Sequence, residues 1–170
     1  GMATARPARL LHVTDPHLFG DPQREIYDVR TAESLRRVLA EALGGGATPP
    51  DAIVVTGDIG DDESEQAYRN FRAMLQEVGV PVLCLPGNHD APRLMAQLLV
   101  GGGFQYCGRA DFGAWGVVLL DTHLPFDPSG FLAAPELARL DAELRVLADR
   151  HVLVCLHHPP VPIGSAWLDG

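Results

Sequence analysis

Four short apolar segments in this chain are each followed at once by polar residues of the kinds that bind ligands. The segments end at Thr14, Thr56, Leu85 and Leu156, and the chain continues as DPH, GD, PGNHD and HHPP respectively. Amphipathic stretches with a helical period separate most of them. Short apolar runs that alternate with such stretches predict a mostly parallel sheet with right-handed crossovers. We therefore expect an α/β protein.

The hydrophobic pattern also gives approximate bounds for the elements. The expected strands are residues 9–14, 52–56, 80–85, 104–107, 115–120 and 152–156. The expected helices are residues 28–43, 64–78, 92–100 and 135–147. Asp28 or Thr31 is the expected N-cap of the first helix, and Ser64 that of the second. Three glycines, at residues 44–46, end the first helix.

Length and composition are those of a soluble, cytoplasmic protein with one domain. The chain has 170 residues, of which 46% are hydrophobic and 21% charged, enough to bury a core. No apolar run approaches the ~20 residues of a membrane span, and the start of the sequence lacks an apolar stretch of signal-peptide length. The three cysteines, Cys84, Cys107 and Cys155, fit reduced and mostly buried thiols.

The charge balance argues against a nucleic-acid partner. The chain has 22 acidic and 13 basic residues, for a net charge of −9. A general nucleic-acid surface needs clustered positive charge, which this sequence lacks.

The polar residues after the apolar segments form a plausible metal-binding set. Ligands of open α/β sheets bind at the carboxyl ends of the strands, so we expect these residues to meet at one edge of one sheet. Carboxylate, imidazole and amide oxygen suit Mn, Fe, Zn or similar divalent ions. The set contains no thiolate, which disfavours a structural zinc site. Asp58 has two carboxylate oxygens and can bridge two ions.

Each motif taken alone has a plainer explanation. Asp15-x-His17 could be a turn that approaches a helix, and Gly57-Asp58 is an ordinary turn signal. The Asn88-His89-Asp90 segment could cap the following helix, and the paired histidines could be an exposed strand end. The metal-site interpretation depends on the conjunction of all four motifs, each at the end of an expected strand.

The motifs resemble those of a known family. VTDPHLF, VVTGDIGD, LPGNHD and CLHHPPVP match, in order, the D-x-H, G-D, G-N-H-D and H motifs of the calcineurin-like metallophosphoesterases. The match covers essentially the whole chain. HLFGDPQREIYDVRTAESLRRVL and HHPPVPIGSAWLD look like the class III cyclic-nucleotide phosphodiesterase branch, with bacterial glycerophosphodiesterases close by. The resemblance implies a two-sheet β-sandwich flanked by helices.

The resemblance also implies a ligand set for two divalent metal ions. Asp15 and His17 would hold the first ion and Asp58 would bridge the two. Asn88 and His157 would hold the second ion. The implied chemistry is attack of a metal-activated water on a small phosphodiester.

Two further residues would take part in catalysis by the same resemblance. His89 would lie beside the phosphate, stabilising charge or protonating the leaving oxygen, and Asp90 would orient or support it. His158 does not match a ligand position and is expected to have a structural role.

The sequence departs from the family pattern at its end. The family has a later G-H-x-H motif, whereas this sequence has no histidine after His158. We therefore expect residues 1–170 to be the N-terminal part of a single metallophosphoesterase domain, with the second sheet largely missing. We expect a homodimer or higher oligomer to cover the unpaired surface.

The leading functional expectation is hydrolysis of 3′,5′-cyclic nucleotides, with the activity of this chain in question because two histidine ligands are lacking. Fold and metal site do not select the substrate. The alternatives are a glycerophosphodiesterase or another phosphoesterase (a phosphomonoesterase, pyrophosphatase or nuclease), and a non-catalytic protein that binds metal or a partner.

Overall fold

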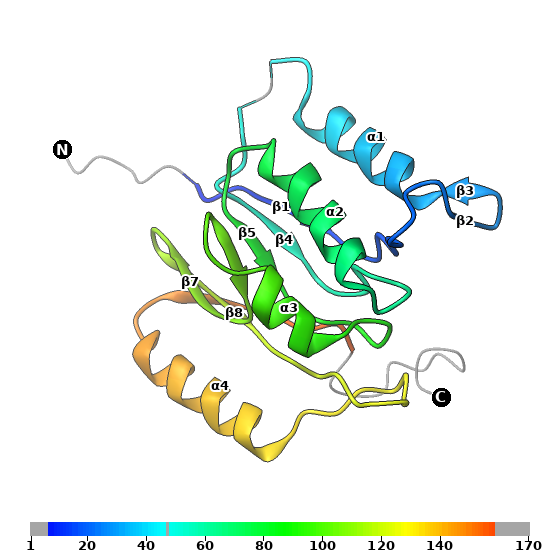
Figure 1. Ribbon diagram of the computed structural model, residues 1–170. Helices are drawn as coiled ribbons and strands as arrows, with labels where there is room; N and C mark the ends of the chain where they lie inside the picture. Colours follow the sequence, from blue (N-terminus) through cyan, green and yellow to red (C-terminus); the bar gives the residue numbers. More distant parts are fainter. Residues whose placement is uncertain (1–6, 47, 159–170) are drawn as a thin grey trace.

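The computed structural model describes residues 7–46 and 48–158 and arranges them in four layers (Figure 1). Three helices cover one face of a first sheet, a second sheet packs on its other face, and a fourth helix covers the second sheet. The elements, in chain order, are β1 (Leu10–Val13), β2 (Glu25–Ile26), β3 (Val29–Arg30), α1 (Thr31–Leu43), β4 (Ala52–Val55), α2 (Glu65–Gln76), β5 (Val82–Cys84), α3 (Pro92–Leu98), β6 (Phe104–Tyr106), β7 (Gly108–Phe112), β8 (Trp115–Leu119), α4 (Ala134–Val146) and β9 (His151–Cys155).

The first sheet is fully parallel, in the order β1-β4-β5-β6. One of its two central strands, β4, reads AIVV and is buried along its whole length, as β-branched strands are when helices and a second sheet cover both faces. Val13 pairs with Val55, and Val55 pairs with Cys84. This register brings the carboxyl ends of β1, β4 and β5 to the same level.

The second sheet has three strands in the order β7-β8-β9. β7 is antiparallel to β8, and β9 is parallel to β8 across the α4 crossover. The chain passes from the first sheet to the second at Cys107 and Gly108, both in the left-handed region with φ of 51° and 82°. The described part of the chain thus contains more of the second sheet than we expected from the sequence.

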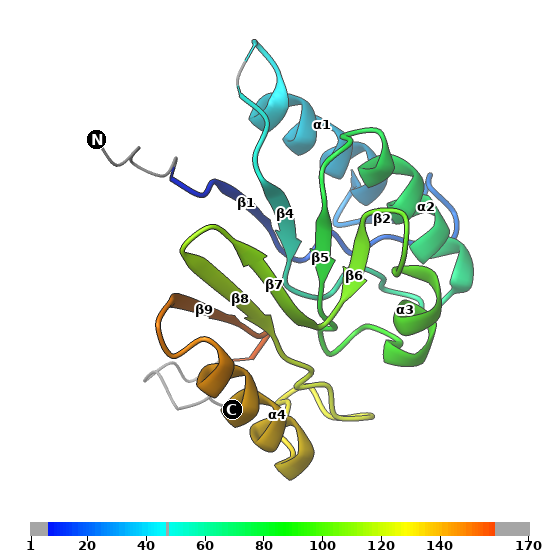
Figure 2. The ribbon, with the colours of Figure 1, turned by 90° about the vertical axis from the view of Figure 1, so that its left-hand side faces the viewer.

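Figure 2 shows the layers from the side. Three apolar clusters hold them together. The cluster under α1, α2 and α3 contains Phe71, Tyr68 and Met95. The cluster between the sheets is built from small and aliphatic side chains, among them Val54 and Val117. α4 packs on the outer face of the second sheet through a smaller cluster that includes Leu147.

Most expected elements are confirmed with ends that differ by a few residues, and two short features were missed. The sequence analysis did not predict the β2–β3 hairpin or β7. The expected cap of α1 at Asp28 or Thr31 is wrong, because Arg30 of β3 runs directly into the helix as its N-cap and makes no side-chain cap bond. The expected cap of α2 is confirmed, since the Ser64 hydroxyl accepts a hydrogen bond from the backbone N–H of Ala67.

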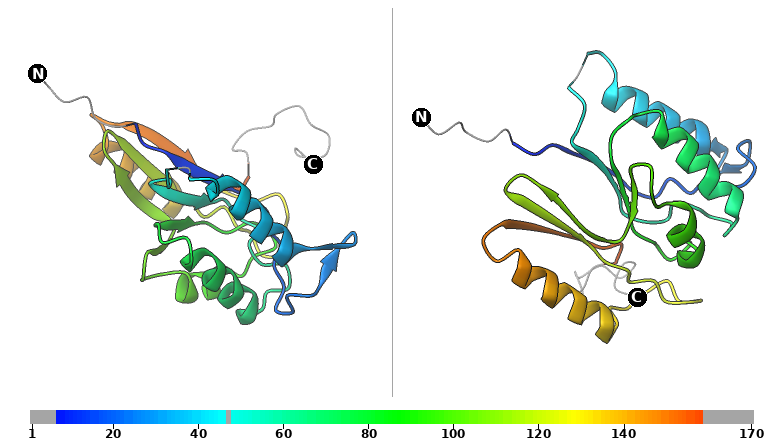
Figure 3. Two further views of the ribbon diagram at one scale, coloured as in Figure 1. Left: turned by 90° about the horizontal axis from the view of Figure 1, so that it is seen from above. Right: turned by 60° about the vertical axis from the view of Figure 1, so that its left-hand side comes forward.

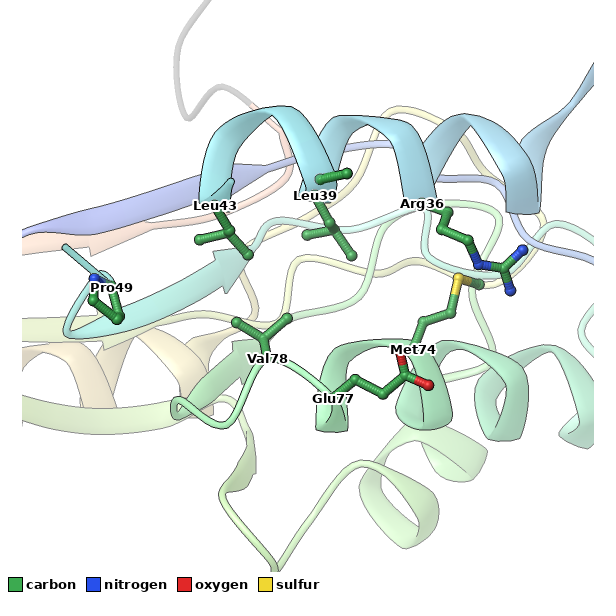
Figure 4. A pocket seen from close by; sticks show the side chains of 8 residues that line it. Arg36, Leu39, Leu43, Pro49, Met74, Glu77 and Val78 are labelled. Carbon is green, nitrogen blue, oxygen red and sulfur yellow. The ribbon is translucent and has the colours of Figure 1, made fainter. Parts of the chain in front are cut away.

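The surface between α1 and α2 has a groove of about 340 Å³ (Figure 4), and no residue of the polar motifs lines it. Its walls are mostly apolar, with Leu39 and Leu43 of α1 facing Met74 and Val78. This arrangement is that of two helices packed on one sheet. Within the described ranges, no helix is long and apolar enough to cross a membrane.

The starts of α1 and α2 give a test of the local structure. We expect Ser64→Ala to lower the free energy of unfolding by about 1 kcal/mol, because an orphan N–H at the start of α2 loses its acceptor. Thr31→Ala, at the uncapped start of α1, should change it by less than ~0.5 kcal/mol. Urea unfolding followed by circular dichroism measures both, and equal effects would contradict the assignment of the cap.

Candidate metal centre

The polar motifs that follow strands of both sheets meet at one place, the candidate metal centre. Asp15 and His17 follow β1, Asp58 follows β4, and Asn88 follows β5, all in the first sheet. His157 follows β9, which belongs to the second sheet. The expectation that all motifs lie on one sheet is therefore wrong. The α4 crossover returns the chain to β8, and the packing of the two sheets brings the fourth motif to the other three.

Asp15, His17 and Asp58 form the first group of possible ligands. The His17 Nε2 atom lies 3.7 Å from Asp15 Oδ1 and 3.9 Å from Asp58 Oδ2. The other ring nitrogen, Nδ1, is 3.0 Å from Oδ1 of Asp61. A histidine that donates its Nδ1 proton to a carboxylate presents a free lone pair on Nε2, as metal-binding histidines do.

Asp58, Asn88 and His157 form the second group. The His157 Nε2 atom lies 3.1 Å from Asn88 Oδ1 and 3.5 Å from Asp58 Oδ2. His157 Nδ1 donates to the carbonyl oxygen of Thr56 at 2.8 Å, so that Nε2 again faces the group. Asp58 Oδ2 therefore faces a histidine on each side. Ligand atoms of Asp15, Asp58 and His157 all lie within 4.8 Å of one another.

Short backbone hydrogen bonds fix the loops that carry these groups. The N–H of Asp15 donates to the carbonyl of Gly57 at 3.1 Å, and the N–H of His17 donates to that of Asp58 at 2.9 Å. The N–H of His89 donates to Oδ1 of Asp58 at 3.0 Å, which leaves Oδ2 turned to the histidines. The positions of the possible ligands are thus set by backbone contacts.

The backbone of the site is strained. Asp15, His17 and Asp58 all lie in the left-handed region, with φ of 57°, 48° and 49°. Non-glycine residues rarely adopt this conformation, and strain of this kind gathers at functional sites. A Cβ atom on Gly87 would collide with the backbone nitrogen and carboxylate of Asp58. Glycine at 87 is therefore required for the two loops to approach this closely.

Charges at the centre of the site are strongly coupled. Burial raises the pKa of Asp58, but hydrogen bonds from His157 and from the backbone N–H of His89 outweigh it and bring the pKa to about 2. Burial lowers the pKa of His157, but its bonds to Asp58 and to the Thr56 carbonyl bring it to about 9. Without metal, a proton on His157 compensates the Asp58 charge. Metal ions and protons compete for such ligands, so this donor set fits a cation.

Asp90 lies beneath the site and is almost completely buried. Its carboxylate accepts hydrogen bonds from the backbone N–H groups of Ile59, Gly60 and Gly87 and from the hydroxyl of Tyr68. Burial raises the pKa of Asp90, while these four donors favour the charged form. Asp90 therefore joins the loop that carries Asp58, the turn at Gly87 and helix α2.

The carboxylate beside His89 is that of Asp61, which the sequence analysis did not single out. Asp61 Oδ1 lies 3.6 Å from Nδ1 of His89 and 3.0 Å from Nδ1 of His17. The rings of the two histidines meet edge to face with centroids 5.4 Å apart. The available signal was the GDIGD spacing, which places Asp61 three residues after Asp58. Asp61 begins the acidic run DDESE before α2, where acidic residues are common at a helix start.

The hydrogen-bond partner of His158 lies outside the ligand group. Its Nδ1 lies 2.8 Å from the hydroxyl of Thr122, which follows β8, and its ring meets that of His157 edge to face. Burial lowers the pKa of His158. These contacts join the loop after β8 to the loop after β9, in keeping with a structural role.

The coupled pair predicts how the stability of the metal-free chain depends on pH. The pKa of His157 is about 9 in the folded chain against an ordinary 6.5, so its contribution is complete below pH 6.5 and disappears as the pH rises through 9. The pKa of Asp58 is lowered from 3.8 to about 2 in the folded chain. Its contribution to stability is therefore present above pH 3.8 and disappears as the pH falls toward 2.

We expect the free energy of unfolding in EDTA to fall by on the order of 2 kcal/mol between pH 6.5 and pH 9. In His157→Gln most of this fall should disappear, because glutamine does not titrate. Urea unfolding at the two pH values measures the difference. An equal fall in both proteins would show that the pair is not responsible.

Comparison with known proteins agrees with this geometry. The family described as calcineurin-like phosphoesterase matches residues 8–170. The 3′,5′-cyclic adenosine monophosphate phosphodiesterase CpdA of Escherichia coli (strain K12) is 37% identical over 162 residues, which cover 95% of this chain and 58% of that protein. The 3′,5′-cyclic-nucleotide phosphodiesterase alr5338 of Nostoc sp. is 31% identical over 163 residues, which cover 96% of this chain and 61% of that protein. The chain thus spans about three fifths of the length of these curated relatives.

The fold also has a counterpart among solved structures. The crystal structure of TT1561 of Thermus thermophilus superposes with a TM-score of 0.61 at 20% sequence identity, covering 93% of this chain and 71% of that one. At this identity the likeness concerns the fold.

Proposed function

The chain belongs to the calcineurin-like phosphoesterase family, and from this premise we propose that it is a metal-dependent phosphodiesterase for 3′,5′-cyclic nucleotides. The observation that carries the proposal is the position of Asp58, whose Oδ2 faces Nε2 of both His17 and His157. The substrate class is supported by the two relatives above, whose names state activity on cyclic nucleotides.

We propose that two divalent ions of the Mn, Fe or Zn type are held by five side chains. Asp15 and His17 would hold one ion, Asn88 and His157 the other, and Asp58 would contact both. The donor set is one of oxygen and imidazole nitrogen, which suits these ions. When bound, such ions acidify water and neutralise charge that develops on a phosphoryl group.

His89 is the proposed proton donor to the leaving oxygen. Its side chain is about half exposed, next to the partly exposed His17, and so can be reached by a substrate. Asp61 Oδ1 lies 3.6 Å from its Nδ1 atom, on the side of the ring where a carboxylate can orient the imidazole. The sequence analysis gave this supporting role to Asp90. We propose instead that Asp90 is a positioning residue that acts through the backbone of both loops.

The activity can be tested with Mn²⁺ and two substrates, bis(p-nitrophenyl) phosphate and 3′,5′-cyclic AMP. We expect Asp58→Ala to abolish both metal binding and turnover. His89→Ala should retain the metal but lose roughly 10²- to 10⁴-fold in kcat, the usual contribution of a general acid. Asp141→Ala, which removes an exposed carboxylate on α4 paired with Arg145, is the matched control and should keep full activity.

Other outcomes of this assay would point to the alternative functions. Bound metal without turnover in the unmodified chain would favour a non-catalytic metal-binding protein. Faster hydrolysis of a glycerophosphodiester than of cyclic AMP would favour the glycerophosphodiesterase alternative.

We further propose that the chain forms a homodimer or higher oligomer. In the part of the chain that the structure describes, β1 and β9 each form an edge of a sheet, and Leu153 on β9 is 39% exposed. Unpaired strand edges with apolar side chains favour association. Size-exclusion chromatography with light scattering should give at least twice the monomer mass, and a monomer at micromolar concentration would refute the proposal.

A further inference from the structure

The loop between β8 and α4 carries an aromatic side chain that the proposed catalytic residues do not explain. Phe126 lies in the LPFDP segment of this loop, and its side chain is fully exposed. Its φ of 62° places it in the left-handed region, which is unfavourable for a bulky residue. The position therefore costs free energy without burying any apolar surface in the described fold.

The loop tip is a defined turn. Pro125 and Pro128 restrict the backbone on either side of Phe126. The N–H of Asp127 donates to the carbonyl of Leu124 at 3.2 Å. The Asp127 carboxylate in turn accepts hydrogen bonds from the backbone N–H and the hydroxyl of Ser129, at 2.9 and 2.6 Å. The phenyl ring is thus presented on a stiff support, which reduces the entropy lost on binding a ligand.

Both ends of the loop are attached next to the proposed metal centre. At its start, the hydroxyl of Thr122 contacts Nδ1 of His158 at 2.8 Å. Near its end, the backbone at Gly130 passes so close to the His158 ring that a Cβ atom would collide with it. His158 directly follows His157, the proposed ligand. The loop extends beyond the carboxyl ends of the strands, on the same side as the turns that carry Asp58 and Asn88 (Figures 1 and 3).

We propose that Phe126 is a specificity residue that stacks on the base of a nucleotide whose phosphate lies at the metal centre. The inference rests on the proposed phosphodiesterase function and assigns a place to the non-reacting part of its substrate. A nucleobase is the occupant that fits, because a planar π-face gains most from an exposed phenyl ring and tolerates a shallow site. A glycerophosphodiester has no such group, so Phe126 discriminates between the two substrate classes.

Phe126→Ala is the direct test, because removal of an exposed side chain leaves the fold unchanged. We expect it to raise KM for 3′,5′-cyclic AMP by about 5- to 100-fold, the range found for the loss of one base stack. The value of kcat and the melting temperature should stay the same. Phe126→Trp should restore or lower KM, and KM for a glycerophosphodiester should be the same in all variants. If Phe126 had only a structural role, Phe126→Ala would lower the melting temperature and would change KM for both substrates by the same factor.

Two other exposed aromatics serve as controls. Trp115→Ala removes a ring that lies against His151, tilted by 35°, at the far end of the second sheet, and should have no effect on KM. Tyr27→Ala removes a fully exposed ring that is also in the left-handed region, but on the β2–β3 hairpin. An increase in KM with Tyr27→Ala and none with Phe126→Ala would place the base beside the β2–β3 hairpin and overturn the inference.

Equilibrium dialysis with AMP and Mn²⁺ separates this inference from the proposed function. If the unmodified chain shows no turnover, the phosphodiesterase proposal fails, yet weaker AMP binding by Phe126→Ala than by the unmodified chain would still support the stacking role. Equal dissociation constants, or no AMP binding by the unmodified chain, would overturn it. Turnover with an unchanged KM in Phe126→Ala would overturn the stacking role alone.

Discussion

The approach of the Asp58 loop to the Gly87 turn is the constraint on which the rest of the site depends. Asp90 joins the two segments from below, since its buried carboxylate accepts N–H groups from Ile59 and Gly60 on one side and Gly87 on the other. Four donors to one buried anion make a stronger attachment than isolated neutral hydrogen bonds would. Burial raises the pKa of Tyr68, whose hydroxyl therefore remains a neutral donor to Asp90.

Asp58 is held in this arrangement in an unfavourable conformation and in an unfavourable charge environment. Its backbone is left-handed, and its carboxylate is buried next to Asp15. In the metal-free chain the compensation comes from the protonated His157, whose pKa is about 9. A divalent cation would compensate the same carboxylate charges with two positive charges instead of one. The electrostatics of the folded chain thus favour cation binding before any family resemblance is considered.

The positions that could be predicted from the sequence are those that follow from local structure. Asp15, Asp58 and Asn88 stand directly after apolar strands, and the parallel register of those strands brings them together. The place of His157 could not be predicted in the same way, because which sheet receives the last strand depends on long-range packing of α4. The two-residue strands β2 and β3 are too short to leave a hydrophobic period. Asp61 was missed because it belongs to an acidic run, and such runs are common at the start of an ordinary helix.

The origin of His157 in the second sheet makes the interface between the sheets part of the site. The apolar layer that separates the sheets, with Val54 on one side and Val117 on the other, sets the distance between the ends of β4 and β9. The bond from His157 to the carbonyl of Thr56 fixes that distance at the edge. Because close-packed interiors transmit small displacements, a change of volume in this layer would move His157 relative to Asp58. Side chains that never contact a ligand therefore determine whether the two proposed cation positions can share one carboxylate.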